Sequence, residues 1–325
     1  MGRRLEDFRR MLGAEPRRPE PGDYSPGARQ IHDTKRLKKS DFDALKQVAV
    51  KHRANKRWRR RRWTTLIVVN LLFVLSYWLD VQLVEGSLSG SRFLGFHMID
   101  VNAALQLMLA HKHLITNLLI GTATIALVWG VLGGRSFCSW VCPYHLLAEW
   151  AEKLHLLLAA KKIVKDHPLH RGLRVVLWAL FAVLAYGTGY TVYETISPTG
   201  ILSRAMIYGP GVVLLWIFAL LAFEVLYSRR AWCRYMCPVG LTYGVVGTVS
   251  PVKVSYDLSK CFHEQDCRKV CLVPHVLDTV VKGRAVTEIV DIGNDCTRCG
   301  LCVDTCPSGA LHFTITGVTK RRTGE

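Results

Sequence analysis

Eleven cysteines fall into short clusters in this chain of 325 residues. The last cluster, "CTRCGLCVDTCP", has the spacing C-x2-C-x2-C-x3-C-P. Thiolates at these intervals wrap around an iron–sulfur cube, whereas a structural zinc site favours two separated pairs. We therefore predict that iron–sulfur clusters are bound by the four cysteines of this run, Cys296, Cys299, Cys302 and Cys306.

A second run, "CFHEQDCRKVCLVP", keeps the same register but changes one ligand. Glu264 stands where the second cysteine is expected. In two-cluster ferredoxins the fourth cysteine of each run ligates the other cluster. We therefore expect two ligand sets in a ferredoxin-like domain, namely Cys271 with Cys296, Cys299 and Cys302 for a [4Fe-4S] cluster, and Cys261 with Cys267 and Cys306 for a second cluster.

The second set lacks a fourth thiolate. It could hold a [3Fe-4S] cluster, or a [4Fe-4S] cluster whose fourth iron takes an oxygen from Glu264 or from water. Because glutamate is usually exposed, Glu264 is equally consistent with a solvated loop residue. His263 is a weaker candidate for the same position.

Two further pairs share the pattern C-x3-C-P, Cys138 with Cys142 in "SFCSWVCPYHLLAEW" and Cys233 with Cys237 in "AWCRYMCPVGLTYG". Residues four apart lie on one face of a helix, about one turn apart, so each pair is expected on one helix face. Together the pairs could form a four-thiolate site for a third cluster, a metal ion or a redox dithiol. The alternative is buried cysteines used as small apolar residues. The repetition, with matching Trp and Pro neighbours, favours the metal or redox role.

Each pair follows a long apolar segment. Half of the residues are apolar, and the mean hydropathy is +0.18. About 20 apolar residues suffice to cross a bilayer, and four runs are long enough to do so, at about residues 63–84, 113–131, 173–193 and 210–227. We therefore expect a mainly α-helical, polytopic membrane protein with four transmembrane helices and a small α+β ferredoxin-like domain. The expected domains are a basic extension at 1–62, a membrane domain at 63–250 and the ferredoxin-like domain at 251–325.

Positive charge is concentrated before and between the apolar runs. Residues 1–62 carry twenty Lys and Arg against eight Asp and Glu, in a chain of formal net charge +18. By the positive-inside rule, this asymmetry places both termini on the cytoplasmic side of a bacterial inner membrane. Anionic membrane lipid is the expected partner of the basic segment, and no nucleic acid is expected. The Gly- and Pro-rich residues 13–30 are expected to form a mobile tail.

The motifs "FCSWVCP" and "WCRYMCP", together with the C-terminal cysteine runs, resemble the NapH/MauN-type ferredoxin-like membrane proteins, relatives of the NosR and PceC membrane domains. The resemblance covers about residues 57–313, and the departures from it are the N-terminal extension and Glu264. It implies an electron-transfer subunit of the quinol dehydrogenase type. Such a subunit links the quinone pool to a respiratory or periplasmic redox enzyme, beside an iron–sulfur or cytochrome partner subunit. The alternative function is an assembly or maintenance factor that reduces a metal centre or cofactor of a partner enzyme.

Residues 96–114, in the loop expected after the first apolar run, mix apolar and polar side chains. His97, Asp100 and Gln106 are candidates there to bind a quinone head group and take its protons, a role that suits histidine near its pKa. Glu224 lies within the fourth apolar run, where a charged group is costly and usually functional. These four residues are the quinone-site candidates of the sequence.

Overall fold

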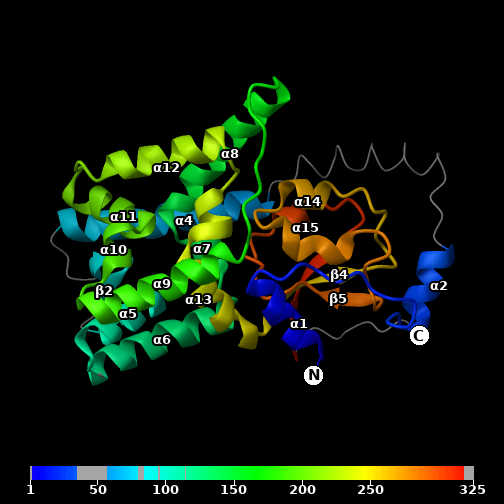
Figure 1. The fold of residues 1–325 in the computed structure, drawn as a ribbon, viewed down its shortest axis with the longest axis horizontal. Coiled ribbons are helices and arrows are strands. Elements are labelled where there is room, and N and C mark those ends of the chain that lie inside the picture. Colours follow the sequence, from blue (N-terminus) through cyan, green and yellow to red (C-terminus); the bar gives the residue numbers. More distant parts are fainter. Residues whose placement is uncertain (1, 35–56, 80–83, 94–95, 114, 318–325) are drawn as a thin grey trace.

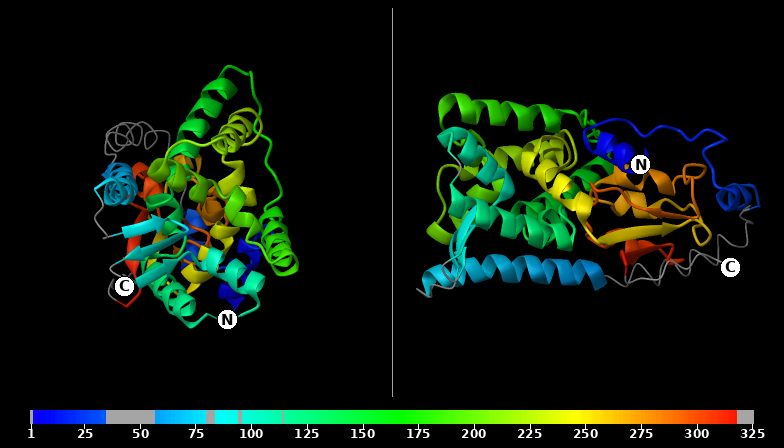
Figure 2. Two further views of the ribbon diagram at one scale, coloured as in Figure 1. Left: turned by 90° about the vertical axis from the view of Figure 1, so that its left-hand side faces the viewer. Right: turned by 90° about the horizontal axis from the view of Figure 1, so that it is seen from below.

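The computed structural model describes residues 2–34, 57–79, 84–93, 96–113 and 115–317, and it contains two units that lie end to end (Figure 1). The larger unit, residues 57–250, is mainly helical and contains one small sheet. The smaller unit, residues 252–315, is built around a three-stranded sheet. Residues 2–34 run along the smaller unit and reach the junction between the two (Figures 1 and 2).

The helices of the larger unit run mostly along the long axis of the molecule (Figure 1). They are α4 (Arg57–Trp78), α5 (Val101–His111), α6 (Thr116–Leu132), α7 (Ser136–Trp140), α8 (Pro143–Ala160), α9 (Leu173–Thr188), α10 (Val192–Ile196), α11 (Pro198–Tyr208), α12 (Leu214–Leu226) and α13 (Pro238–Val246), with the π-helical turn η1 (Trp232–Met236) before α13 and the 3-10 turn η2 (Gly247–Val249) after it.

Local sequence explains where several of these helices begin and end. A proline occupies the start of α8, α11 and α13, where the missing N–H costs no hydrogen bond. Asp100 caps α5 by accepting hydrogen bonds from the backbone N–H groups of Asn102 and Ala103. Glycines with positive φ end α6 at Gly133 and α9 at Gly189.

The segment between α4 and α5 contains a small sheet in place of the expected loop. Its strands are β1 (Val84–Ser87), β2 (Gly90–Phe93) and β3 (Phe96–Ile99), paired antiparallel in the order β1-β2-β3. The last part of the expected loop forms α5. The sheet therefore brings residues 96–100 beside α6, which packs against β3.

The structure contradicts the four predicted transmembrane helices. Within the ranges given above, no helix is both long enough and apolar enough to cross a bilayer. The 22 residues of α4 include five arginines among the first six, while α6, α9 and α12 have 17, 16 and 13 residues. Gly189 ends α9 before its apolar run is complete. The predicted multi-pass location in the inner membrane, with both termini cytoplasmic, is contradicted by the same finding. The lipid contact expected for residues 1–62 stays a prediction.

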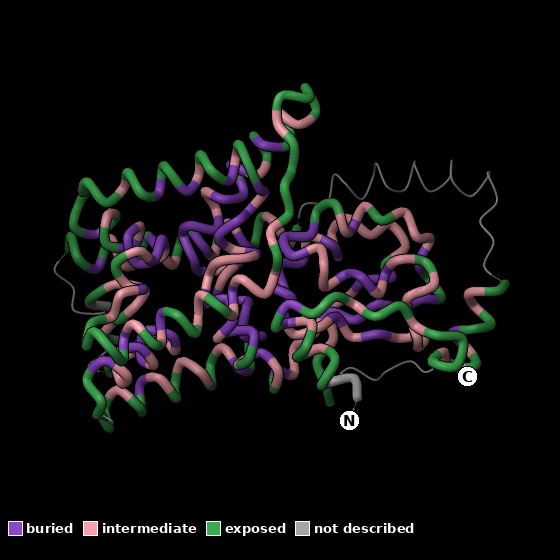
Figure 3. Tube along the Cα trace, in the orientation of Figure 1, coloured by how far each residue is buried: buried purple, intermediate pink, exposed green. Residues whose placement is uncertain are grey.

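The apolar character of the helices is real, but much of it lies on their outer faces. Leu127, Val183, Leu215 and Phe218 are each about two-thirds exposed, at 66–68%. Buried segments gather instead inside each unit and where the two units meet (Figure 3). The junction between the units is therefore a packed part of the protein.

The smaller unit is a sheet covered on one face by short helices (Figure 1). Its strands are β4 (Val252–Asp257), β5 (Ile289–Asp291) and β6 (Leu311–Ile315), paired antiparallel with β4 in the centre. The covering elements are α14 (Asp266–Val270), α15 (Leu301–Thr305) and the 3-10 segment η3 (Pro274–Val280). Val254 and Tyr256 of β4 are buried in the same core as most cysteines of this unit.

The N-terminal segment, residues 2–34 with helices α1 (Gly2–Met11) and α2 (Pro26–Thr34), is packed, contrary to the mobile tail expected for residues 13–30. The Tyr24 hydroxyl donates a hydrogen bond of 2.6 Å to the Gly283 carbonyl, and Ala28 is fully buried in the core of the smaller unit. At the junction, Nη2 of Arg174 donates to the Met11 carbonyl over 2.7 Å. The segment therefore contacts both units.

Candidate iron–sulfur sites

The four cysteines of the paired motifs line one cavity in the helical unit. Cys138 and Cys142 come from the corner between α7 and α8, and Cys233 and Cys237 come from the corner between η1 and α13. The two copies of the motif, almost a hundred residues apart, therefore meet at one place. We call this group the helical thiol set.

Each pair turns a corner and does not lie on one helix face, so the predicted one-face placement is wrong. Cys138 lies in α7 and Cys233 in η1, whereas Cys142 and Cys237 follow in extended backbone with ψ of 118° and 112°. The proline after each second cysteine disfavours the helical conformation of the preceding residue and starts the next helix. The corner points both cysteines of a pair toward the shared cavity.

Burial governs the protonation of these thiols. It raises the pKa of Cys138 to about 12 and that of Cys142 to about 11. Both thiols therefore keep their protons at neutral pH unless a metal binds, because metal coordination releases the thiol proton.

Two buried arginines beside the helical thiol set carry donors without acceptors. Arg135 and Arg230 are 2% and 1% exposed and line the same cavity. Among the described residues, Nε of Arg135 and Nη2 of Arg230 have no hydrogen-bond partner. Both guanidinium groups form ion pairs, Arg135 with Asp295 and Arg230 with Glu152. A cluster held by four thiolates is anionic and would accept hydrogen bonds from the two donors that remain. The residues present therefore fit an iron–sulfur cluster.

A second cavity, against β4 in the smaller unit, is lined by Cys271, Cys296, Cys299 and Cys302, which we call the complete ferredoxin set. Arg298 and Gly300 have positive φ, so the backbone curls around this cavity. The Arg298 N–H donates to Sγ of Cys296 over 3.4 Å, a contact that iron–sulfur clusters receive from backbone amides. The structure thus brings Cys271 to the cysteines of the later run, and iron binding there stays a prediction.

The remaining thiols, Cys261, Cys267 and Cys306, pack in the same core and form the three-cysteine set. Burial raises the pKa of Cys267 to about 12. Sγ of Cys261 accepts a hydrogen bond from the His263 N–H over 3.3 Å. Glu264 is half-buried on the loop that leads into α14, and its role as fourth ligand stays a prediction.

All eleven cysteines are free of disulfide bonds in this structure. Across the described part of the chain, no three His, Cys, Asp or Glu side chains lie close enough together to hold a single metal ion.

The helical thiol set and the complete ferredoxin set adjoin one another. Val273 and Thr297 line both cavities, so the same two side chains form the wall between them. Oγ of Ser139, which follows Cys138, donates a hydrogen bond of 2.7 Å to the Thr297 carbonyl, which follows Cys296. The segment that carries one thiol set therefore directly holds the segment that carries the other.

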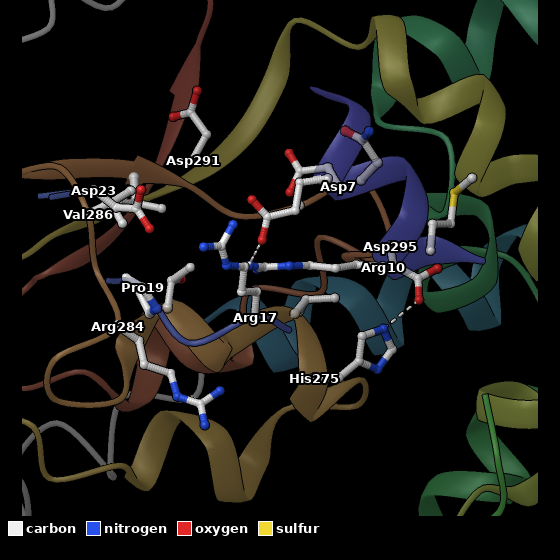
Figure 4. Close-up of a pocket in the computed structure, with 17 residues that line it drawn as sticks. Asp7, Arg10, Arg17, Pro19, Asp23, His275, Arg284, Val286, Asp291 and Asp295 are labelled. Carbon is white, nitrogen blue, oxygen red and sulfur yellow. Dashed lines mark hydrogen bonds and ion pairs between the residues drawn. The ribbon is translucent and has the colours of Figure 1, made fainter. Parts of the chain in front are cut away.

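A buried ion cluster centres on Asp295, the residue before Cys296. Arg135 and Arg174 donate to Oδ1 of Asp295 over 2.6 and 3.1 Å, and Nε2 of His275 lies 2.6 Å from Oδ2. His275 and Asp295 both line the cleft between the N-terminal segment and the smaller unit, and His275 points at Asp295 there (Figure 4). Burial alone would raise the pKa of Asp295, but the two guanidinium groups outweigh it and hold that pKa well below its usual range. Sequence reasoning missed this cluster, because isolated charged residues carry no local signal of a long-range contact.

Asp100 is the quinone candidate that lines a cavity. It lies at an apolar groove of about 700 Å³ whose walls include Val69, Trp129 and Phe137. Its Oδ2 caps α5, while its Oδ1 has no hydrogen-bond partner among the described residues.

The other three candidates lie outside the lining of this groove. His97 is exposed on β3, and Gln106 is buried in α5. Glu224 is buried in α12, where its Oε1 accepts a hydrogen bond of 3.0 Å from the Trp232 N–H. The structure therefore does not bring the four candidates together.

Comparison with known families matches residues 114–164 and 208–255 to one 4Fe-4S binding domain and residues 289–312 to another. The first match includes both C-x3-C-P pairs.

The chain is 30% identical over 258 residues to the ferredoxin-type protein NapH of Haemophilus influenzae, covering 79% of this chain and 88% of that protein. It is 34% identical over 269 residues to the methylamine utilization ferredoxin-type protein MauN of Methylorubrum extorquens, covering 82% and 91%. It is 33% identical over 268 residues to NapH of Escherichia coli, covering 80% and 91%. No solved structure matches the chain.

Proposed function

Because the chain belongs to the family of NapH and MauN ferredoxin-type proteins, we propose that it carries single electrons through three adjoining iron–sulfur sites, from a quinol to a separate redox protein. The iron–sulfur electron-transfer role follows from the family and from its 4Fe-4S binding domains. The number of clusters, their arrangement and the quinol are the proposal. Iron–sulfur clusters supply one-electron chemistry with potentials that the surrounding protein adjusts.

The three thiol sets would each hold one cluster. The helical thiol set and the complete ferredoxin set each offer four sulfur ligands, which suit [4Fe-4S]. The three-cysteine set suits [3Fe-4S], or [4Fe-4S] with Glu264 or water on the fourth iron.

The observation that carries the proposal is the shared wall between two cavities, formed by Val273 and Thr297. Thiol sets that are one side chain apart suit electron transfer between their clusters. The complete ferredoxin set in turn adjoins the three-cysteine set, because cysteines of both sets pack in one buried core. The helical thiol set thus neighbours the complete ferredoxin set, which in turn neighbours the three-cysteine set.

The apolar groove supports a quinol as the electron donor. Its volume of about 700 Å³ suits a ring with an apolar tail, since ligand pockets typically enclose about 300–1,000 Å³. The groove is lined by Phe137, the neighbour of Cys138, and by Arg298, which lies between Cys296 and Cys299. A quinol releases two electrons and two protons on oxidation, and Oδ1 of Asp100 is placed to accept the first proton. Burial raises the pKa of Asp100, which makes its carboxylate a stronger base.

Reduction by a soluble quinol analogue tests this function. Cluster absorbance in the purified full chain should bleach rapidly with the quinol analogue and with dithionite. Asp100→Asn should slow bleaching by the quinol about 100-fold, the usual contribution of a positioned base, and leave bleaching by dithionite unchanged. Asp166→Asn, at an exposed ion pair with Arg229, is the matched control and should leave both rates unchanged.

The opposite result separates the two candidate functions. Clusters that accept electrons from dithionite but not from the quinol would overturn the quinol link and favour an assembly or maintenance factor that reduces a partner's metal centre. An unchanged quinol rate in Asp100→Asn would remove Asp100 from the site. The electron acceptor is expected to be an iron–sulfur or cytochrome subunit, and co-purification would identify it.

A further inference from the structure

The Tyr256 hydroxyl is buried in the core of the smaller unit and has no hydrogen-bond partner in the part of the chain that the structure describes. Tyr256 is in the central strand β4, opposite Val290 of β5 and Leu311 of β6. Its side chain is fully buried in the core that contains Cys261 and Cys267. Among the described residues, its hydroxyl has no partner. A buried polar group without a partner in a native structure calls for an explanation.

Tyr256 packs in the same buried core as Cys261 and Cys267, and Cys306 packs against that core. After burial, these three thiols further raise the pKa of the Tyr256 hydroxyl, Cys261 most. The hydroxyl therefore lies in the core that also holds the three-cysteine set.

The same face of β4 serves the neighbouring site differently. Val254 precedes Tyr256 by two residues, so the two side chains point to the same side of the strand. Val254 lines the cavity of the complete ferredoxin set. Strand β4 thus presents the aliphatic side chain of Val254 to the complete ferredoxin set. It presents the hydroxyl of Tyr256 in the core of the three-cysteine set.

We propose that Tyr256 donates a hydrogen bond from its hydroxyl to the Cys261 thiolate of the cluster held by the three-cysteine set, and thereby raises the reduction potential of that cluster. Hydrogen bonds to cluster sulfur withdraw negative charge and favour the reduced form, which carries one more electron. Tyr256 is a positioning residue in this role, since the iron ligands remain the three cysteines and Glu264 or water. The inference rests on the proposed function, because it requires a cluster at this set.

Tyr256→Phe tests the proposal, because it removes the hydroxyl and keeps the ring. The full chain is titrated with dithionite and mediators, and each cluster is followed by its own electron paramagnetic resonance signal. The one-electron reduction equilibrium of the cluster at the three-cysteine set should shift about three- to tenfold toward the oxidised form, where tenfold is about 59 mV. The cluster at the complete ferredoxin set should keep its potential and serves as an internal reference.

Two further variants complete the test. Tyr24→Phe removes a hydroxyl that bonds the Gly283 carbonyl in the same unit and should change neither potential. Tyr256→Leu also lacks the hydroxyl and should lower the reduction potential as Tyr256→Phe does. If one of the two variants fails to fold, the other still tests the proposal. An exchangeable proton coupling to this cluster in deuterated water should disappear in Tyr256→Phe, leaving the coupling from the His263 amide.

An unchanged potential in a Tyr256→Phe protein that retains its iron would overturn the role of Tyr256 and leave the electron-transfer function standing. Loss of potential at both clusters together would also overturn it, because a general structural effect would then explain the change. A wild-type protein without iron at this set would overturn both proposals. Since dithionite replaces the quinol in this titration, failure of the quinol link does not affect the outcome.

Discussion

The Arg135 guanidinium and the Asp295 carboxylate form a buried ion pair of 2.6 Å across the junction of the two units. Arg135 lies three residues before Cys138, and Asp295 lies one residue before Cys296. Nη1 of Arg135 also donates to the backbone carbonyl of Asp295 over 3.0 Å. The pair therefore sets the position of one thiol set relative to the other.

Replacing Asp295 should weaken the junction strongly. Asp295→Asn leaves Arg135 and Arg174 buried with an uncompensated charge, so the free energy of unfolding should fall by about 3–5 kcal/mol. Urea unfolding followed by tryptophan fluorescence measures this change. Asp166→Asn is the control, since its pair with Arg229 is 2.6 Å long but about a third exposed, and it should cost less than about 1 kcal/mol. Equal effects of the two substitutions would contradict the role assigned to the junction.

A second buried ion pair, Arg62 with Glu149, should make the stability of the protein depend on pH. Burial alone would raise the pKa of Glu149, but Arg62 outweighs it and lowers that pKa. A lowered carboxyl pKa stabilises the protein above the unfolded value of about 4.3, and this stability is lost as the pH falls through the folded pKa. Glu149→Gln should therefore cost about 3 kcal/mol throughout pH 5.5–8, with the difference shrinking below about pH 4. Urea midpoints of both proteins across this range check it, and a difference that changes between pH 6 and 8 would contradict it.

The helical thiol set should behave as one site. Cys138→Ser, Cys237→Ser and the double variant should lose the same amount of bound iron, because removing either of these ligands empties a shared cluster. Iron and sulfide analysis of the purified proteins measures this. Cys302→Ser, at a different set, should add its loss to that of Cys138→Ser. Additive losses from Cys138 and Cys237 would instead show two sites, and no loss would show none.

Glu264 should control the nuclearity of the cluster at the three-cysteine set. The wild-type protein should show a [3Fe-4S] signal in the oxidised state, because a hard oxygen ligand holds the fourth iron weakly. Glu264→Cys supplies a soft ligand at the spacing of the complete run and should convert that signal to a [4Fe-4S] signal, while Glu264→Ala should not. A wild-type spectrum with only [4Fe-4S] signals, unchanged in both variants, would show that the fourth ligand lies elsewhere.

Cysteine spacing predicts more of the candidate sites than any other feature of the sequence. The comparisons confirm the resemblance to NapH and MauN that the motifs indicate. The shared register of the two runs pairs Cys271 with Cys296, and the structure places these residues around one cavity. Pro143 and Pro238 also argue against placing each cysteine pair on one helix face. A residue before proline favours extended backbone, so both motifs had to turn a corner.

Other features depend on contacts that no local pattern encodes. Hydropathy counts apolar residues but does not locate the helix end at Gly189, and the length predicted for that helix was wrong. Arg135 and Asp295 are 160 residues apart in the sequence. Arginine and aspartate are both common in loops, so neither residue stands out in the sequence. The groove beside Asp100 lies where residues from both units meet. The composition of residues 96–114 therefore indicates a mixed polar and apolar site but does not predict the shape of the groove.

The docking of the N-terminal segment also fixes an order of events during synthesis. Tyr24 and His32 contact Gly283 and Ala285, which lie 259 and 253 residues further along the chain. At roughly 5–20 residues per second, a ribosome needs on the order of 10–50 s to bridge that separation. Throughout this interval α2 lacks the surface of the smaller unit against which it packs. A nascent chain stalled before residue 283 therefore leaves Tyr24 and α2 accessible to proteases and chaperones, whereas the complete fold covers them.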